Sequence, residues 1–417
     1  MNMIGEIIAI GDELTSGRIL NTTSGYAARK LFDAGYTIHA MSTIGDHPEL
    51  IGEALLRAIG RVDFIIVTGG LGSTDDDITN EAVSHALERP TLPNLTILAR
   101  IREHLKRGPS PNNPLEKLAW LPDGADPFDP VSRIAGYQLV HQDTPIFFLP
   151  GVPEEMKDLM TRAVLPKLAA WQAGSALQTR QRIFKVFGLA ESEINLRIKG
   201  LDLDGEIKIG YYPVYPDVHV SLLLRSTDSS QAAERFEAGC LRLEEVLEDH
   251  VYGIDSDELE SVVGRLLSGS NRTLCAAESC TGGLLAHRVT KVAGSSDYFL
   301  GGVVAYANEL KSSLLGVSPE TLTAHGAVSP ETASLMATGV RTRCGADISI
   351  SITGIAGPSG GSIDKPVGTV FIGISSSHIT EIERLQFSGD RHRIQAMAAH
   401  TGLDLLRRFL LRLQPLT

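Results

Sequence analysis

Short apolar runs alternate with amphipathic stretches along the first 170 residues of the chain. Apolar runs of a few residues are typical of buried strands, and apolar residues spaced three or four apart are typical of helices. The predicted strands are 4–10, 36–43, 63–67 and 146–149, and the predicted helices are 21–33, 48–58, 79–88, 96–106 and 154–171. This order predicts βαβ units in a mostly parallel sheet that is covered on both faces, within a first domain over 1–170.

The pattern changes after the first domain to a compact β-α-β-β-α order. The predicted elements are 182–187, 192–198, 207–212, 218–225 and 231–248. This order resembles RNA-binding modules of the KH type, but the segment carries neither a glycine-rich basic clamp nor an aromatic platform for stacking bases. We therefore expect residues 171–252 to be a small KH-like α+β connector or dimer element, with a linker over 251–257.

Strands and helices alternate again over residues 258–417. The predicted strands are 273–277, 301–306, 347–352 and 367–374, and the predicted helices are 258–268, 284–292, 332–341 and 391–412, with one more beginning at 307. The fold class is therefore α/β, in a chain of three domains.

Composition narrows the class of protein without deciding its function. Lys and Arg number 38 and Asp and Glu number 50, so the net charge of −12 gives no general attraction for nucleic-acid phosphates. The four cysteines form no C-x-x-C pair, and no apolar run reaches the roughly 18 residues of a membrane span. We expect a cytoplasmic protein without membrane contact or direct contact with nucleic acid.

A tight glycine turn joins the strand at 273–277 to the helix at 284–292. It places the Ser279 hydroxyl where a strand ends and a helix begins, beside the unpaired N–H groups of the first helical turn. Such donors would face the negative oxygen that forms when a nucleophile attacks a carbonyl group. A simple helix cap is the alternative use of a serine at this position.

A serine nucleophile needs a base, and Lys311 is the best candidate because it lies early in a helix that follows a strand end. Burial there would disfavour the ammonium form, so the amine could take the serine proton near neutral pH. No spacing marks His287, His325 or His392 as the base. Cys280 is the rival nucleophile, but no base is evident near it, and free cysteines commonly pack into the core.

Two further glycine-rich runs follow predicted strands. In the run 68–77, glycine amides and a helix start could hold a phosphate. Its three successive aspartates suggest Mg²⁺ bridging to phosphate oxygens, with a solvated helix start as the alternative. The run 353–361 follows a strand that we expect to neighbour the Ser279 strand, so its backbone donors are predicted to share one pocket with Ser279.

Several motifs occur in an order that closely resembles the CinA family of competence/damage-inducible proteins. Those of its C-terminal domain are E-S-C-T-G-G (278–283), Y-A-N-E-L-K (306–311), H-G-A-V-S (325–329), T-G-I-A-G-P with G-G (353–361), K-P-V-G-T-V (365–370) and F-S-G-D-R (387–391). Those of its first domain, which has the molybdopterin-binding fold, are G-D-E-L (11–14), T-G-G-L-G with D-D (68–77) and L-P-G-V-P-E-E-M (149–156).

This resemblance implies a nicotinamide-nucleotide amidase in the last domain, which hydrolyses nicotinamide mononucleotide to nicotinic acid mononucleotide and ammonia without a cofactor. Ser279 would attack the carboxamide, Lys311 would serve as base, and backbone N–H groups near 281–283 would hold the oxyanion. The implied substrate-binding residues are Glu278, Thr281, Gly282, Gly283, Tyr306, Asn308, Thr353, Gly354, Ala356, Gly357 and Arg391.

For the first domain, the resemblance implies divalent-metal-dependent cleavage of ADP-ribose to AMP and ribose 5-phosphate. The residues implied near the phosphates are Gly69, Gly70 and Thr74, and those implied near the metal, Mg²⁺ or a similar ion, are Asp12, Asp76 and Asp77. The whole would be a bifunctional enzyme of pyridine-nucleotide salvage. The middle unit matches the family's connector, which implies a homodimer.

Two departures from the family pattern fall in the first domain. Ser73 stands where the family usually has proline, and 129–136 reads D-P-V-S-R-I-A-G where the family usually carries N-P-x-G-T-A-P-G. They motivate an alternative in which this domain binds a nucleotide or pterin without turning it over. A partner role in DNA uptake or repair is a third alternative, although the acidic charge argues against direct DNA contact.

Overall fold

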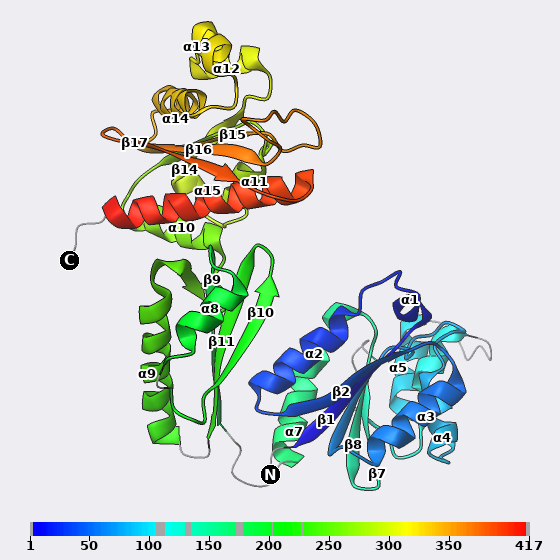
Figure 1. Ribbon diagram of the computed structural model, residues 1–417. Helices are drawn as coiled ribbons and strands as arrows, with labels where there is room; N and C mark the ends of the chain where they lie inside the picture. Colours follow the sequence, from blue (N-terminus) through cyan, green and yellow to red (C-terminus); the bar gives the residue numbers. More distant parts are fainter. Residues whose placement is uncertain are drawn as a thin grey trace. The chain divides into compact units, whose positions relative to one another are not determined.

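The computed structural model describes residues 3–105, 113–129, 135–171, 178–201, 203–226 and 229–413. The chain divides into two compact units: unit 1 holds 1–180 with 224–233, and unit 2 holds 181–223 with 234–417 (Figure 1). Within the described ranges, none of the helices is long and apolar enough to cross a bilayer.

Unit 1 contains the elements of the first predicted domain. Its strands are β1 Ile4–Ile10, β2 Thr37–Ile44, β3 Phe64–Thr68, β4 Thr91–Pro93, β5 Trp120–Pro122, β6 Asp126–Pro127, β7 Tyr137–His141 and β8 Thr144–Leu149. Its helices are α1 Asp12–Thr15, α2 Thr22–Asp33, α3 Pro48–Ile59, α4 Thr79–Ala86, α5 Leu95–Leu105, α6 Pro153–Leu159 and α7 Leu165–Trp171, with a 3₁₀ turn η1 Pro114–Ala119 and a π turn η2 Met160–Val164.

The main sheet of unit 1 has the strand order β2-β1-β3-β8-β7-β6. Strands β2, β1, β3 and β8 run parallel, and α2 and α7 cover one face while α3, α4 and α5 cover the other (Figure 1). The predicted parallel sheet is therefore confirmed, but the hairpin β7–β8 was not predicted. Its turn is formed by Gln142 and Asp143, both at positive φ, so the usual glycine signal of such a turn is missing from the sequence.

The middle segment of the chain, residues 178–254, lies between the first and the C-terminal domains in the sequence. It comprises β9 Gln178–Val186, α8 Glu191–Ile198, β10 Lys208–Val214, β11 Asp217–Ser226, α9 Ser229–Leu247, a 3₁₀ turn η3 Glu248–His250 and β12 Val251–Ile254. The sheet order is β10-β11-β9-β12. The predicted linker over 251–257 is therefore wrong for its first half, because β12 pairs with β9 and Tyr252 is buried.

The C-terminal domain follows within unit 2. Its strands are β13 Leu274–Glu278, β14 Phe299–Val304, β15 Ile348–Gly354, β16 Thr369–Ser375 and β17 Thr380–Gln386. Its helices are α10 Leu259–Gly269, α11 Leu284–Thr290, α12 Asn308–Leu315, α13 Pro319–His325, α14 Pro330–Cys344 and α15 Arg391–Leu413, with a 3₁₀ turn η4 Ser295–Asp297. The unpredicted strand β17 is the sheet edge, and its partly exposed side chains leave no clear apolar run.

The C-terminal sheet has the order β14-β13-β15-β16-β17, with the first three strands parallel. The predicted neighbour relation between the Ser279 strand and the strand before 353–361 is therefore confirmed. Figure 1 shows α14 on one face of the sheet and α10 and α15 on the other. Because parallel strands end at the same edge, the segments after β13, β14 and β15 meet there.

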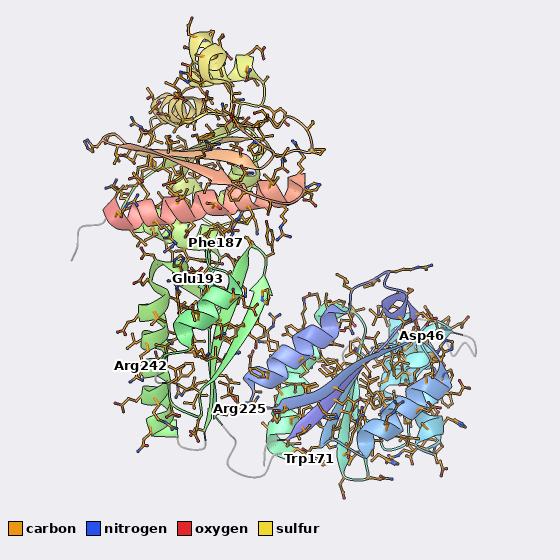
Figure 2. The ribbon with its side chains drawn as sticks, in the orientation of Figure 1. Asp46, Trp171, Phe187, Glu193, Arg225 and Arg242 are labelled. Carbon is orange, nitrogen blue, oxygen red and sulfur yellow. The ribbon has the colours of Figure 1, made fainter. Side chains whose placement is uncertain are left out.

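Alternation along β13 assigns its side chains to two separate cores. Leu274 and Ala276 join the core beneath α10, α11 and α15, whereas Cys275 and Ala277 join the core beneath α12 and α14. Phe187 of the middle segment also belongs to the first core, where its ring lies 4.5 Å from that of His400 on α15 (Figure 2). Because side chains alternate between the two faces of the sheet along β13, the residues just after β13 also point to alternate faces.

Candidate active site

Ser279 and Lys311 meet at the edge where the three parallel strands end. Ser279 follows β13 directly, and its amide continues the sheet ladder by donating to the Ile352 carbonyl at 2.9 Å. Lys311 lies in the first turn of α12, and its Nζ is 3.2 Å from Ser279 Oγ. The Ser279 residue is 8% exposed and Lys311 is 1% exposed, so the pair is almost free of solvent.

The Lys311 amine is held by two further hydrogen bonds. Its Nζ donates to the carbonyls of Ala305 at 2.8 Å and Tyr306 at 3.2 Å. Burial lowers the pKa of Lys311, because the charged ammonium loses hydration there. When the amine is neutral, two N–H bonds can stay on the carbonyls while the lone pair faces Ser279. That is the geometry of a general base beside a hydroxyl nucleophile.

The Glu278 side chain forms its hydrogen bonds with the turn that follows it. This buried carboxylate accepts hydrogen bonds from the amides of Gly283, Leu285 and Ala286 at 2.8–3.1 Å, which anchors the start of α11. The Gly282 amide donates back to the Ser279 carbonyl. Of the amides predicted to hold an oxyanion, Gly282 and Gly283 are therefore already paired in the described chain.

Thr281 keeps two unused hydrogen-bond donors in this turn, and Cys280 keeps one. The Thr281 hydroxyl is buried and has no partner in the described chain. No hydrogen bond to a described residue is found for its amide or for that of Cys280. An unpaired buried polar group is costly, so Thr281 is where a bound polar ligand would gain most.

Arg391 links two sides of the site. Its guanidinium donates to the Gly357 carbonyl and to the Tyr306 hydroxyl, both at 2.8 Å. Tyr306 itself is 59% exposed, so its ring stands at the rim of the site. Arg391 thereby joins the second glycine-rich run to the β14–α12 connection. Its positive charge suits an anionic group of a ligand.

The remaining predicted residues take up supporting positions. The Thr353 hydroxyl is fully buried and donates to the Ala327 carbonyl at 2.7 Å. Gly354 ends β15 against Val370, and Ala356 is buried after it. Asn308 is exposed at the first residue of α12. These four lie at the same strand edge as Ser279, without a hydrogen bond to it.

Unit 1 carries a separate pocket of about 650 Å³ at the carboxyl ends of its strands. Predicted residues that line it are Gly69, Gly70, Thr74, Asp76 and Asp77, and Ser73 lines it as well. At Gly69, φ is +100° and a Cβ atom would lie 2.1 Å from the Ile10 carbonyl oxygen, so only glycine fits there. Glycine at this position therefore lets the loop pack directly against the end of β1.

Three of the carboxylates in or next to this pocket accept hydrogen bonds from backbone amides. Asp77 accepts hydrogen bonds from the amide and hydroxyl of Thr74, so it braces the loop. Asp12 and Asp46 each accept a hydrogen bond from the other's amide, at 3.1 and 2.8 Å. Burial, then the negative charges of Asp12, Glu13 and Asp76, raise the pKa of Asp46. Like charges held this close favour a bound cation.

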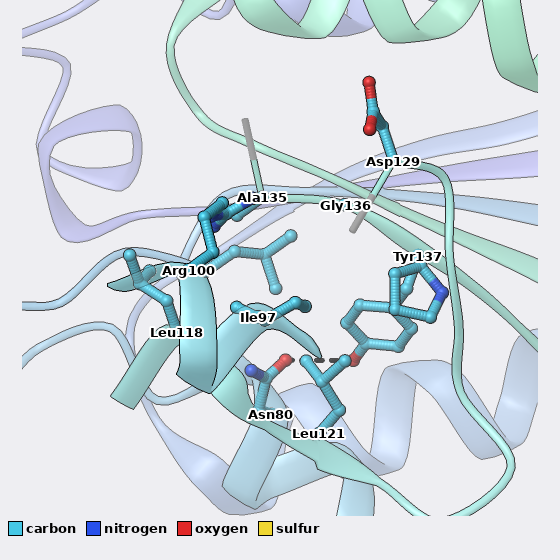
Figure 3. A pocket seen from close by; sticks show the side chains of 11 residues that line it. Asn80, Ile97, Arg100, Leu118, Leu121, Asp129, Ala135, Gly136 and Tyr137 are labelled. Carbon is cyan, nitrogen blue, oxygen red and sulfur yellow. Dashed lines mark hydrogen bonds between the residues drawn. The ribbon is translucent and has the colours of Figure 1, made fainter. Parts of the chain in front are cut away.

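A small pocket is lined by Leu71 of the loop 68–77 and by Asn80, Leu118 and Tyr137 (Figure 3). Its volume is about 20 Å³, which is room for one water molecule. The Tyr137 hydroxyl donates to Asn80 at 2.9 Å across one wall, as Figure 3 shows. Leu71, Leu118 and Ala135 line both this cavity and the larger pocket. Of the departing run 129–136, residues 130–134 lie outside the described residues.

Two residues with a place in these sites were missed from the sequence. Asp46 follows β2, where a lone aspartate before a helix resembles an ordinary cap (Figure 2). Gln395 on α15 donates from Nε2 to the Cys280 carbonyl at 2.7 Å, although 115 residues separate them. No local pattern announces such a contact, because it depends on the packing of a helix against a distant turn.

Comparisons with known families cover nearly the whole chain. Residues 6–170 match the "Probable molybdopterin binding domain", residues 181–253 the "Damage-inducible protein CinA KH domain", and residues 256–410 the "CinA C-terminal domain".

Individual relatives agree with these matches. A CinA-like protein of Desulfotalea psychrophila is 54% identical over 98% of this chain and 99% of its own. One of Syntrophobacter fumaroxidans is 40% identical over 97% and 96%. The crystal structure of competence damage-inducible protein A from Klebsiella pneumoniae is 37% identical, covers 37% of this chain and 97% of its own, and has a TM-score of 0.37. The chain belongs to the CinA family, with a molybdopterin-binding-type domain, a KH domain and a CinA C-terminal domain in that order.

Proposed function

We propose that the C-terminal domain hydrolyses the carboxamide of nicotinamide mononucleotide, giving nicotinic acid mononucleotide and ammonia. The observation that carries this proposal is the 3.2 Å approach of Lys311 Nζ to Ser279 Oγ in a nearly solvent-free site. A serine hydroxyl paired with a lysine amine is a known catalytic arrangement, and burial lowers the pKa of this lysine.

The first half of the reaction forms an ester on the protein. Ser279 Oγ attacks the carboxamide carbon while Lys311 takes the hydroxyl proton. The carbonyl oxygen becomes an oxyanion. We propose that it accepts hydrogen bonds from the Thr281 amide and hydroxyl, which have no partner in the described chain. As the C–N bond breaks, the Lys311 ammonium gives its proton to the leaving nitrogen, so that ammonia departs and Lys311 is neutral again.

The second half removes the ester with water. Lys311 deprotonates a water molecule that attacks the acyl carbon, and its proton returns to Ser279 as the C–O bond breaks. Arg391 and Tyr306 stand at the rim, where we propose that they hold the nucleotide part of the substrate. No cofactor is needed in either half.

The direct test uses the full-length protein. Purified wild type is expected to release ammonia from nicotinamide mononucleotide, with nicotinic acid mononucleotide as the matching product in a mass spectrum. The Ser279→Ala variant should release none above background. Ammonia release that persists in this variant would move the nucleophile away from Ser279, and none in the wild type would overturn the proposal.

A second candidate function concerns unit 1, where we propose metal-dependent cleavage of pyrophosphates of the ADP-ribose type. ADP-ribose itself would give AMP and ribose 5-phosphate. The specific observation in its favour is a pocket of about 650 Å³ lined by the glycine loop and by Asp46, which is hydrogen-bonded to Asp12; Asp12 itself is not one of the lining residues. A domain that only binds a nucleotide or pterin is the competing possibility.

The residues present suit a divalent cation that is shared with the substrate. The described ranges hold no group of three or more His, Cys, Asp or Glu side chains arranged for a metal, but Mg²⁺ commonly takes one or two carboxylates together with phosphate oxygens. Asp12 and Asp46 would hold it, and when bound it would neutralise charge on the pyrophosphate. Gly70 would offer its backbone N–H to the phosphates, whereas the Gly69 N–H already donates to the Leu149 carbonyl at 3.0 Å.

Product analysis separates catalysis from binding alone. With ADP-ribose and Mg²⁺, the wild type is expected to form AMP, and a chelator should stop this while leaving ammonia release unchanged. Heat released on mixing with ADP-ribose, without any AMP, would retire the pyrophosphatase in favour of a binding domain.

A further inference from the structure

We propose that Gln395 is a positioning residue of the amidase site: it fixes the peptide between Cys280 and Thr281 so that the Thr281 amide faces the acyl group under attack. This inference rests on the proposed amidase function and adds a residue to it. Gln395 touches neither Ser279 nor Lys311 through any hydrogen bond found in the described chain, so its effect would be exerted through the turn.

The contact itself sets the direction of the peptide. Gln395 Nε2 donates to the Cys280 carbonyl at 2.7 Å, from the helix α15. In a trans peptide the C=O and the following N–H point in opposite directions. With the Cys280 carbonyl turned toward α15, the Thr281 N–H points away from α15, toward the face of the sheet that carries α12 and Lys311.

The neighbouring amides of the turn are already committed. Ser279 donates to Ile352, Gly282 to Ser279 and Leu284 to Thr281. The amides of Gly283, Leu285 and Ala286 all donate to the Glu278 carboxylate. Of the amides between Ser279 and Ala286, those of Cys280 and Thr281 therefore keep no partner among the described residues, and the buried, unpartnered hydroxyl makes Thr281 the residue with two unused donors.

The turn needs an outside anchor because its backbone is permissive. Gly282 and Gly283 follow with φ of +63° and +101°, and because glycine restricts its backbone less than other residues, the chain after Thr281 does little to fix the Cys280–Thr281 peptide. A rotated Cys280–Thr281 peptide would present a carbonyl oxygen, instead of an N–H, to the oxyanion. Gln395 opposes this rotation because the rotation would break the hydrogen bond from its Nε2 to the Cys280 carbonyl, and the side-chain amide would have to flip before its oxygen could accept from the Thr281 N–H.

The experiment compares three replacements of Gln395 in the full-length protein. Gln395→Leu and Gln395→Glu remove the N–H donor at similar volume, and Gln395→Arg restores one. Met397→Leu, on the same helix and packed against the same core, controls for altered packing. Two quantities are measured for each: kcat and KM for nicotinamide mononucleotide, and the rate at which a fluorophosphonate probe labels Ser279.

The two donor-free variants are expected to lower kcat about 10- to 100-fold with KM changed less than about 3-fold, which is less than the roughly 10²- to 10³-fold for outright loss of one oxyanion donor because the Thr281 N–H is misdirected and not removed. Probe labelling should slow in parallel, and Gln395→Arg should recover most of both rates. Wild-type rates in both donor-free variants would overturn the inference, as would loss of rate in Met397→Leu of the same size.

The probe separates the two proposals. If the wild type labels at Ser279 but releases no ammonia, the proposed substrate is wrong, while slower labelling of the Gln395→Leu variant still supports the positioning role. If the wild type releases ammonia and Gln395→Leu does so equally fast, the amidase stands and the positioning role falls. A wild type that neither labels nor releases ammonia overturns both.

Discussion

Ser279 and Cys280 are neighbours in the sequence and lie on opposite faces of the C-terminal sheet. The alternation along β13 continues past its end, so Ser279 meets Lys311 of α12, whereas Cys280 joins the core beneath α10, α11 and α15. Burial raises the pKa of Cys280 to about 12. Of two adjacent side chains with nucleophilic atoms, only the hydroxyl has a base beside it.

We therefore predict that Cys280→Ala keeps ammonia release within about 3-fold of wild type, because a thiol with so high a pKa supplies almost no thiolate at neutral pH. The matched variant Ser279→Ala should lose activity entirely. The measurement is ammonia release per protein molecule under saturating nicotinamide mononucleotide. A Cys280→Ala variant as inactive as Ser279→Ala, yet folded by circular dichroism, would contradict the assignment of the nucleophile.

Lys311 is predicted to act through its neutral form, which distinguishes it from arginine. Lys311→Arg keeps a positive charge but cannot lose its proton, so kcat should fall about 10²- to 10⁴-fold, the usual contribution of a general base. Lys311→Met should fall equally. If Lys311→Arg retained most of the activity, the role of Lys311 would be to supply charge and not to accept a proton.

The pH dependence of kcat follows from the same group. Because burial lowers the pKa of Lys311 below its ordinary 10.5, kcat should rise with pH through the lowered value and level off above it. The stability effect has the matching sign: the buried ammonium penalises the folded state at low pH, and the penalty disappears as pH rises toward 10.5. Initial rates from pH 6 to 10 check the first point, and a rate that falls across this range contradicts it.

The placement of Ser279 and Lys311 at the ends of strands was the part of the site that the sequence predicted best. The apolar run before Ser279, the glycines after it and the helix after 307 were enough to place Ser279 and Lys311 near one edge, since parallel strands end together. The same strand-end argument added the run 353–361, and the family motifs added Tyr306 and Arg391. The structure brings Arg391 and Tyr306 into direct contact, which spacing could not show.

Contacts between distant elements account for what the sequence did not reveal. Glu278 was expected at the substrate, but its carboxylate is taken by three amides of the next helix. Gln395 and Asp46 act on backbone groups of remote turns, so neither has a local signature. Strand β17 and the hairpin β7–β8 were missed because an exposed edge and a glycine-free turn both weaken the pattern.

Serine residues on β15 are predicted to stabilise the domain, not to catalyse. The fully buried hydroxyls of Ser349 and Ser351 donate to the carbonyls of Ala337 and Ala333 on α14, each at 2.6 Å. Ser351→Ala should lower the free energy of unfolding by about 1 kcal/mol, the net value of one such bond. Ser268→Ala, at an exposed position on α10, is the matched control and should change nothing measurable.

The probe for this stability measurement has to report on unit 2. Both tryptophans, Trp120 and Trp171, lie in unit 1, so their fluorescence would follow the wrong transition. Urea unfolding is better followed by the loss of Ser279 labelling with a fluorophosphonate. A Ser351→Ala midpoint equal to that of Ser268→Ala would show that these bonds add no net stability.

Asp46 provides the sharpest test of the second proposed activity, because it was not selected from the sequence. Asp46→Asn keeps an oxygen that can accept the hydrogen bond from the Asp12 amide, but it removes one negative charge from the cluster. We predict that the Mg²⁺ concentration for half-maximal ADP-ribose cleavage rises about 10- to 100-fold, as for loss of a group that holds or orients a metal. Ammonia release from nicotinamide mononucleotide should be unchanged, since it belongs to unit 2.

The control for this variant is Asp123→Asn. Asp123 lies away from the residues that line the pocket and carries the same charge, so it reports what a general loss of acidity does. If both variants need equally more Mg²⁺, bulk charge and not a site explains the effect. If neither does, while AMP still forms only with Mg²⁺, the ion is held by other groups, and the carboxylate pair Asp12–Asp46 has to be assigned a structural role in joining β2 to α1.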